Sequence, residues 1–342
     1  MTQVRAPADA AITISIAFVH GILSGVRARN EAIDDFLADA GIAAALLEQP
    51  SARVTAEQFV ALFRSLTERR DDDLLGFVSR PLRRGSIAMI FRAATSAATL
   101  GMAMRRAAHT FGLLQDDVAL VPLHDGPLSG WALRFRDPGA GQLPFFHELS
   151  LRVFWRLLAW LAGGRLPAAR FDFAFDAPAY AGSYGPVFTA PLRFRQPLSA
   201  MWFEAAVLRQ PVRRDEAALR EFLRDAQGQV IVPRHGADSV TGRLRQHLQH
   251  SQPAWPGLAA CAAALHMSTA TLQRRLAQEG TAFQQLKDEL RRDLAISRLH
   301  TSAVPVSALA IDLGFADSPA FQRAFKRWTG SAPGLYRQRG PG

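Results

Sequence analysis

The fold is decided by Leu258-Ala-Ala-Cys-Ala-Ala-Ala-Leu-His-Met-Ser268-Thr-Ala-Thr-Leu272-Gln-Arg-Arg-Leu276, a stretch in the last hundred residues. The pattern predicts an apolar helix, a short turn and a second helix that begins after Ser268, a residue type that caps helices well. At about 100° per residue, Leu272 and Leu276 share the buried face of that second helix, so the side chains opposite them are free to contact another molecule. Residues 257–278 therefore fit a helix-turn-helix motif.

The same pattern returns between residues 306 and 329. Within Phe321-Gln-Arg-Ala-Phe325-Lys-Arg-Trp328, the three aromatic side chains recur at i, i+4 and i+7 and form one apolar stripe. Gly314 suits a turn at positive φ, and Asp317 or Ser318 can cap the helix. One such motif is about as well explained by an ordinary amphipathic helix pair, because helix-turn-helix matches are loose. Two in tandem indicate two helices that read DNA.

Residues 283–299, between the two motifs, are predicted to form one uninterrupted helix with apolar residues at spacings of three and four. At about 1.5 Å per residue, this helix is roughly 25 Å long. Successive major grooves on one face of B-DNA are about 34 Å apart, a separation that the helix and the flanking bundles could span together. The prediction is a binding site of two adjacent major-groove segments per chain.

Several groups of residues in the last third of the chain follow a known pattern. They are Arg274-Arg-Leu276, Gly280-Thr-Ala-Phe283, Arg291 with Ala295, Leu313-Gly-Phe315, and the run from Phe321 to Arg337. In these residues, the region from about 238 to 339 resembles the AraC/XylS transcription factors. The resemblance implies a seven-helix DNA-binding domain whose two recognition helices enter neighbouring major grooves. It places the base-reading positions at Ala270, Gln273, Arg274, Ala320, Gln322 and Arg323.

Some of these positions depart from the common family pattern. Ala270 stands where many relatives have a large or polar side chain, and Ser318-Pro319 replaces a more usual polar pair. Gln pairs bidentately with adenine and Arg with guanine, each worth about 1–3 kcal/mol of discrimination. Sequence reading is therefore expected mainly from Gln273, Arg274, Gln322 and Arg323, with Lys326 and Arg327 on the same cationic face.

The positive charge of the chain is concentrated in the same region. From residue 234 onward there are 14 Lys and Arg against 7 Asp and Glu, whereas the first 233 residues carry 26 against 23. A basic surface alone could also serve solubility or face lipid. Together with the two motifs, it predicts DNA binding that weakens strongly with salt, because binding releases the counterions of the phosphates.

Length and composition indicate an ordinary globular chain. It has 342 residues, of which 49% are hydrophobic and 20% charged, and no apolar run approaches the length of about 18 that a membrane span needs. With no signal-peptide pattern at its start, a cytoplasmic location is expected. Cys261 is the single cysteine, so intramolecular disulfides and thiolate metal clusters are excluded, and we expect this thiol to be buried as a small hydrophobe.

The preceding residues predict a separate α+β domain. Helical patterns cover 12–29, 33–40, 56–69, 87–108 and 145–161, while 118–136 alternates like a hairpin and 171–175 like a strand. Gly and Pro break the periodicity between 225 and 238. The prediction is an α+β domain over 1–225, a linker over 226–237 and an all-α domain over 238–342, in which a linker helix joins the two motifs.

Residues 38–42, 53–58, 147–158 and 171–178 resemble, more weakly, the arabinose-binding-type sensor domain found in a branch of AraC/XylS regulators. The resemblance implies a domain that senses a small molecule and often mediates dimerisation, although the effector need not be a sugar. Phe146, His147 and Trp155 are the candidate effector residues, because they combine aromatic bulk with polar atoms. The alternative is that their helix is simply the central core helix of the domain.

No pattern in the sequence demands an enzyme. Phosphate-binding loops, nucleophile elbows and close metal-ligand spacings are absent, apart from His247 and His250, a pair more typical of a helix surface. We therefore assign no catalytic residue, cofactor or metal. We expect a transcription regulator, more often an activator in this family, whose effector or second copy alters its hold on promoter DNA beside RNA polymerase. The alternative is a DNA-tethered enzyme or repair factor with catalysis in the N-terminal domain.

Overall fold

The computed structural model describes residues 11–185, 187–224, 228 and 239–337. Within them the chain forms two compact units that do not follow the order of the sequence. The mixed unit contains residues 17–40 and 60–224, and the helical unit combines 239–337 with 11–16 and 41–59. The linker predicted over 226–237 lies outside the described residues, apart from position 228, and the predicted domain boundaries stay a prediction.

The mixed unit is built on a five-stranded sheet in the order β3-β4-β7-β5-β6. Its strands are β3 (Val118–Asp125), β4 (Leu128–Phe135), β5 (Arg170–Asp172), β6 (Leu192–Arg193) and β7 (Ala200–Glu204). All neighbouring strands are antiparallel except β5 and β6. Gly130 allows β4 to lie beside β7, since a Cβ there would stand 1.9 Å from the carbonyl oxygen of Met201. The predicted hairpin over 118–136 is confirmed.

Helix α6 (Pro144–Leu161) forms the core of the mixed unit, and most of its side chains are buried, polar ones included. The other helices of the N-terminal half are α1 (Ile16–Arg27), α2 (Asp34–Asp39), α3 (Ala56–Arg70), α4 (Ser86–Thr95), α5 (Leu100–Leu114) and α7 (Glu216–Arg224). This mixture of helices and an antiparallel sheet confirms the predicted α+β class.

Three predicted elements differ from the structure. The helix predicted over 87–108 is wrong: α4 ends at Thr95, and a new helix, α5, begins after Thr99, whose hydroxyl accepts from the amide of Met102 at 3.3 Å. The helix predicted from Ile12 begins only at Ile16, because the preceding residues pair with another segment as a strand. The strand predicted over 171–175 is limited to β5. Apolar periodicity crosses each of these boundaries, so it could not show where a cap or a strand pairing interrupts it.

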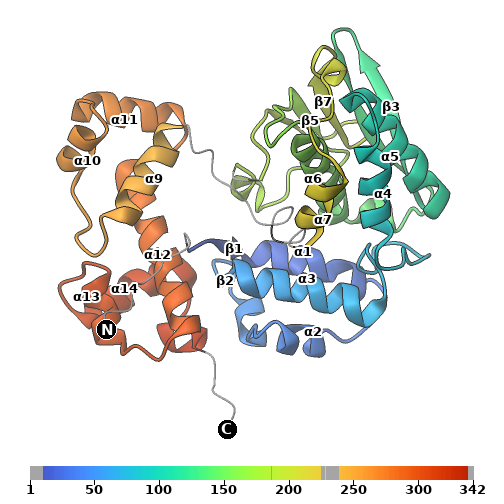
Figure 1. Ribbon diagram of the computed structural model, residues 1–342. Helices are drawn as coiled ribbons and strands as arrows, with labels where there is room; N and C mark the ends of the chain where they lie inside the picture. The colour runs from blue at the N-terminus through green and yellow to red at the C-terminus, as the bar shows by residue number, and fades with distance from the viewer. Residues whose placement is uncertain (1–10, 186, 225–227, 229–238, 338–342) are drawn as a thin grey trace. The chain divides into compact units, whose positions relative to one another are not determined.

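From residue 239 onward the helical unit is entirely helical. It consists of α9 (Val240–His250), α10 (Leu258–Ala264), α11 (Thr269–Gln278), α12 (Phe283–Thr301), α13 (Val306–Asp312), α14 (Ser318–Thr329) and the 3-10 helix η5 (Pro333–Tyr336). Figure 1 shows α9, α10 and α11 at one end of α12, and α13 and α14 at the other. The predicted linker helix over 283–299 is confirmed. Near the start of the chain, β1 (Thr13–Ser15), the 3-10 helix η1 (Ala44–Glu48) and β2 (Arg53–Thr55) complete the unit.

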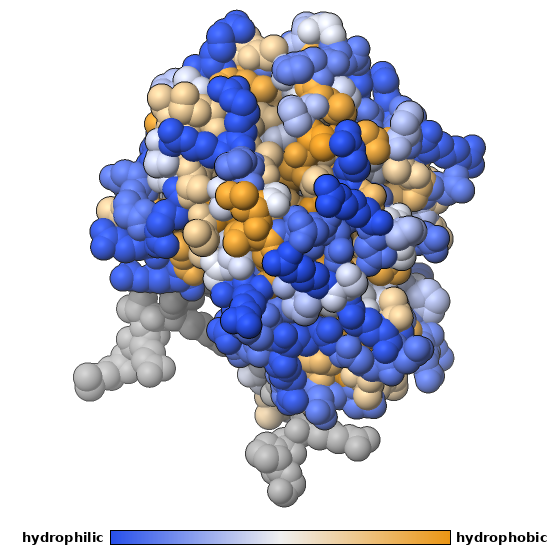
Figure 2. All heavy atoms as spheres, turned by 90° about the vertical axis from the view of Figure 1, so that its right-hand side faces the viewer, coloured by the Kyte–Doolittle hydropathy of each residue, from blue (hydrophilic) through white to orange (hydrophobic). Residues whose placement is uncertain are grey.

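Hydrophilic side chains cover most of the face drawn in Figure 2, with hydrophobic ones exposed in smaller groups between them. Among the described residues, the large hydrophobic side chains that remain exposed are Met89, Leu113 and Ile311. In that part of the chain, no helix is long and apolar enough to span a membrane.

Candidate nucleic-acid interface

The first candidate reading helix is α11. Ser268 caps it as predicted, since its Oγ accepts from the amide of Thr271 at 3.2 Å. Leu272 and Leu276 are fully buried, so this face of the helix is held by the rest of the unit. The exposed side chains away from that face include Ala270, Gln273 and Arg274.

The second candidate reading helix is α14. Asp317 caps it by accepting from the amide three residues further on at 2.6 Å, and Pro319 occupies the first turn, where its missing N–H costs nothing. Phe321 and Phe325 are fully buried, and Gly330 ends the helix with a left-handed φ of 74°. The exposed side chains are Gln322, Arg323, Lys326 and Arg327, and Ala320 is partly buried in the first turn.

Trp255, in the segment before α10, ties the two motifs together. Its indole Nε1 donates to the carbonyl oxygen of Asp312 at 3.0 Å, at the end of α13. The guanidinium of Arg291 lies 5.2 Å from the Trp255 ring and 5.1 Å from the Phe315 ring, and so contacts both motifs. Trp255 has a φ of 46°, a region in which a bulky residue is strained. These contacts therefore hold the start of the first motif against the turn of the second.

A buried polar cluster joins residues from the start of the chain to α12. Asp293 Oδ1 accepts from Thr13 Oγ1 at 2.6 Å and from Arg292 Nε at 3.0 Å. Arg53 Nε donates to Thr13 Oγ1 at 2.6 Å and lies 3.8 Å from Asp293 Oδ1. Burial, reinforced by the charge of Arg292, lowers the pKa of Arg53 to about 10. Arg53 is still cationic at neutral pH, so the cluster contains an ion pair in which the Asp293 side chain is 9% exposed and the Arg53 side chain 22% exposed.

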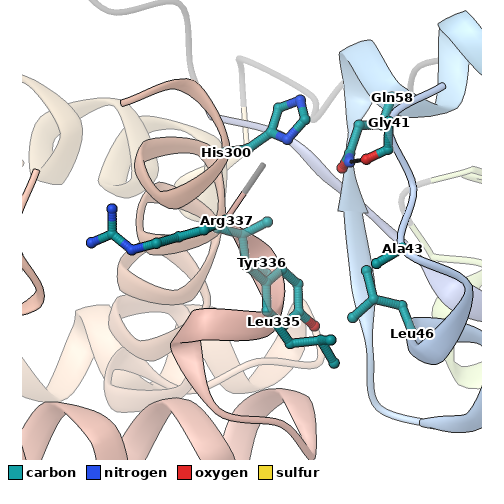
Figure 3. Close-up of a pocket in the computed structure, with 9 residues that line it drawn as sticks. Gly41, Ala43, Leu46, Gln58, His300, Leu335, Tyr336 and Arg337 are labelled. Atoms are coloured by element: carbon teal, nitrogen blue, oxygen red, sulfur yellow. Dashed lines mark hydrogen bonds between the residues drawn. The ribbon is translucent and has the colours of Figure 1, made fainter. Parts of the chain in front are cut away.

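A small pocket lies between residues 41–58 and the end of the helical unit (Figure 3). It is lined by Gly41, Ala43, Leu46 and Gln58 on one side and by Ile296, His300, Leu335, Tyr336 and Arg337 on the other. Figure 3 shows Tyr336 across from Leu46. Burial lowers the pKa of His300, against the opposing charge of Glu57. None of the predicted site residues lines this pocket, which follows the contact between residues 41–59 and the end of the helical unit.

The predicted effector residues all lie in the core of the mixed unit. Phe146 stacks on another phenylalanine, with ring centroids 4.9 Å apart. The ring nitrogens of His147 contact the hydroxyl of Ser199 at 2.7 Å and a backbone carbonyl at 3.0 Å, and burial lowers its pKa. Trp155 Nε1 donates to a backbone carbonyl at 2.9 Å. Their polar atoms have partners within the protein, and their role towards an effector stays a prediction.

Glu148, the residue after His147, is buried with an incomplete set of partners. Its Oε1 accepts from the hydroxyls of Tyr180, at 2.8 Å, and of Tyr184. Its Oε2 is buried and has no hydrogen-bond partner among the residues that the structure describes. Burial raises the pKa of Glu148 to about 7, although the two tyrosine hydroxyls act in the opposite direction. The sequence places Glu148 on the same helix as the candidate effector residues, but it does not indicate which partners the carboxyl group lacks.

We expect Glu148→Gln to melt at a higher temperature than the unmodified protein at about pH 8, and to lose this advantage towards about pH 4. The folded carboxyl has a pKa of about 7 against an ordinary 4.5, so the folded state binds the extra proton and its stability falls as the pH rises between these values. Glutamine stays neutral and keeps an oxygen for the tyrosines. Melting curves across this pH range measure the difference, with Glu204→Gln, exposed at the end of β7, as the control. Parallel pH profiles for Glu148→Gln and the unmodified protein would contradict the expectation.

Comparison with known proteins finds relatives for both parts of the chain. Residues 32–212 match the family described as "Arabinose-binding domain of AraC transcription regulator, N-term", and residues 261–339 match the family described as "Helix-turn-helix domain". The chain is 27% identical over 328 residues to the ornithine utilization regulator of Pseudomonas aeruginosa. The matched region covers 95% of this chain and 96% of that protein. It is 37% identical over 100 residues to the HTH-type transcriptional regulator VqsM of the same organism, or 28% of this chain and 31% of that protein. The HTH-type transcriptional regulator VirS of Mycobacterium tuberculosis is 26% identical over 196 residues, which is 57% of either chain.

Proposed function

The chain belongs to the AraC family of transcription regulators, with an N-terminal ligand-binding domain and a C-terminal helix-turn-helix domain that binds DNA, and from this premise we propose how it reads its site. Helices α11 and α14 enter two adjacent major grooves of one duplex. Gln273 and Arg274 read bases in one groove, and Gln322 and Arg323 read bases in the other. Lys326 and Arg327 contact the phosphates beside the second groove, while Ala270 and Ala320 offer methyl contacts.

One observation carries this proposal. Each candidate reading helix is capped at its start and packed through its apolar face, yet exposes amide and guanidinium groups on the rest of its surface. These are the groups that pair bidentately with adenine and guanine in the major groove. Because Trp255 and Arg291 contact both motifs, the two helices meet DNA as one body.

Regulation begins in the ligand-binding domain. A small-molecule effector, or a second copy of the chain, changes how firmly the two motifs hold promoter DNA, and contact with RNA polymerase then activates transcription. The ornithine utilization regulator supports a metabolite as the effector, because its name connects a relative of similar length with the use of an amino acid. The cluster of Thr13, Arg53 and Asp293 offers a physical link, since Arg53 lies in the segment that matches the ligand-binding family.

Arg274→Ala and Arg323→Ala are each expected to relax base selectivity in a different half of the binding site, by about 1–3 kcal/mol, because each arginine reads different bases. Lys326→Ala should weaken binding to all sequences alike and reduce the slope of log affinity against log salt by about one, because it contacts a phosphate. The measurement is the affinity of the full-length protein for an in vitro selected site and for single-base variants in each half, at several salt concentrations. If both arginine variants kept full selectivity, the reading residues would be wrongly assigned.

A further inference from the structure

The buried acids of the described residues differ in what neutralises them. Asp172 and Asp293 each pair with an arginine, and Asp72 accepts from three backbone amides. Glu148 is only 3% exposed and forms no ion pair with any residue that the structure describes, and its Oε2 has no hydrogen-bond donor. A buried carboxylate oxygen without a donor is costly, and its presence in a folded protein requires an explanation.

Two tyrosine rings lie beside this carboxyl group, and a phenylalanine ring packs against both of them. Tyr180 and Tyr184 donate to its Oε1, and their ring centroids are 5.8 Å apart. The ring of Phe18, from α1, lies 5.9 Å from Tyr180 and 6.5 Å from Tyr184. Tyr184 is fully buried whereas Tyr180 is partly exposed, so Tyr180 marks the side from which a molecule can approach. Aromatic faces attract cations, and the group therefore joins a carboxylate to rings suited to a positive charge.

We propose that Glu148, with Phe18, Tyr180 and Tyr184, recognises an ammonium group of the effector. Glu148 Oε2 accepts from an N–H of the ligand, and the rings contact its charge. The inference rests on the proposed function, because it names the chemical class of the molecule that the ligand-binding domain senses.

An ammonium group supplies both things that Glu148 lacks. Its N–H provides the missing donor to Oε2, and its charge compensates the buried carboxylate. A sugar hydroxyl would provide only the donor, and a carboxylate ligand would add a like charge. Arg152, one turn further along α6, donates to the carbonyl oxygen of Val187. Among the described residues, the side chains whose hydrogen bonds favour the ionised form of Glu148 are the two tyrosines, which are themselves neutral.

The test uses the full-length protein in thermal melts and titration calorimetry. The probes are ethanolamine, putrescine and ornithine, each beside the compound in which a hydroxyl replaces every amine. At saturation, at least one amine should raise the Tm by about 2 °C or more, while its hydroxyl counterpart should not. Glu148→Gln should reduce the amine affinity by about 100-fold or more, because a cation then meets no buried charge. Glu204→Gln, which changes an exposed acid in the same unit, should keep the unmodified affinity.

Each outcome decides one question. If none of the three amines raises the Tm, or if Glu148→Gln keeps the full response, the ammonium site is wrong. If a hydroxyl compound binds both proteins equally well, the ammonium site is wrong and the ligand-binding domain stands. Sequence-specific DNA binding is measured on the same samples, and its absence from the unmodified protein would overturn the proposed function, whatever the amines do.

Discussion

Asp293→Ala is expected to lower the free energy of unfolding by about 3 kcal/mol and to loosen residues 11–16 and 41–59 from α12. Asp293 is the carboxylate that accepts from Thr13 and neutralises Arg53 and Arg292 in a buried cluster. Removal of one partner from a buried ion pair is more costly than the pair is worth, because the remaining charge stays buried without compensation. The lowered pKa of Arg53 shows that its surroundings already disfavour the charge, and Asp293 comes first among the groups that oppose this effect.

Asp288→Ala is the matched control, because Asp288 lies on the same helix and contacts only Gln284 among the hydrogen bonds of its side chain in the described residues. We expect a change within about 0.5 kcal/mol for this variant. Urea melts give the change in stability, and hydrogen exchange at the β1–β2 amides shows whether the loss is local to the docked segment. Thr13→Val, Asp293→Ala and the double variant together give the coupling energy between these two side chains. Equal stability of Asp293→Ala and Asp288→Ala would mean that the cluster does not hold the segment.

Trp255→Ala is expected to lower the free energy of unfolding by about 3–5 kcal/mol and to make DNA binding less sensitive to the spacing of the two half-sites. The side chain is 5% exposed, donates to the carbonyl oxygen of Asp312 and lies beside Arg291, so its removal leaves a cavity and takes a donor from that carbonyl. Without this contact one of the links between the motifs is lost, and their relative position becomes less restricted.

The spacing effect separates a positioning role from a purely structural one. In the unmodified protein, one or two base pairs inserted between the half-sites should reduce affinity by about 10-fold or more. Each inserted base pair turns one half-site relative to the other by about 34° around the DNA axis. Trp255→Ala should lose affinity for the native site and show a smaller penalty for the insertions. Trp255→Phe keeps a ring beside Arg291, so its spacing penalty should lie between that of the unmodified protein and that of Trp255→Ala. A spacing penalty unchanged in Trp255→Ala would contradict the positioning role.

Much of the helical region could be predicted because its signals are local. Ser268 and Asp317 cap helices within three residues of themselves, and Gly314 adopts the positive φ expected of it. Helix α3 also follows its prediction, since Thr55 and Gln58 exchange hydrogen bonds in a capping box at its start. Cys261 is buried as expected.

The failures share one cause. The helix predicted from Ile12 gives way to β1 because residues 13–15 pair as a strand with residues 53–55, far along the chain. Trp255 was overlooked although it is an isolated aromatic residue in a stretch that contains prolines, because its importance depends on a contact with Asp312. The effector role of Phe146, His147 and Trp155 is not among these failures and stays a prediction. Residue type alone suggests it, and the polar atoms of His147 and Trp155 have partners within the protein.

The sequence by itself determined the two capped, amphipathic helices of the motifs, the helix between them and the side chains that they expose. These features depend on residues only a few positions apart. The tertiary structure alone decided which distant residues meet. It placed Thr13 against Asp293, 280 positions away, brought Trp255 to the turn of the second motif, and left one oxygen of Glu148 without a donor. Such contacts depend on how whole elements pack, and the free energy of that packing is not encoded in any short stretch of the chain.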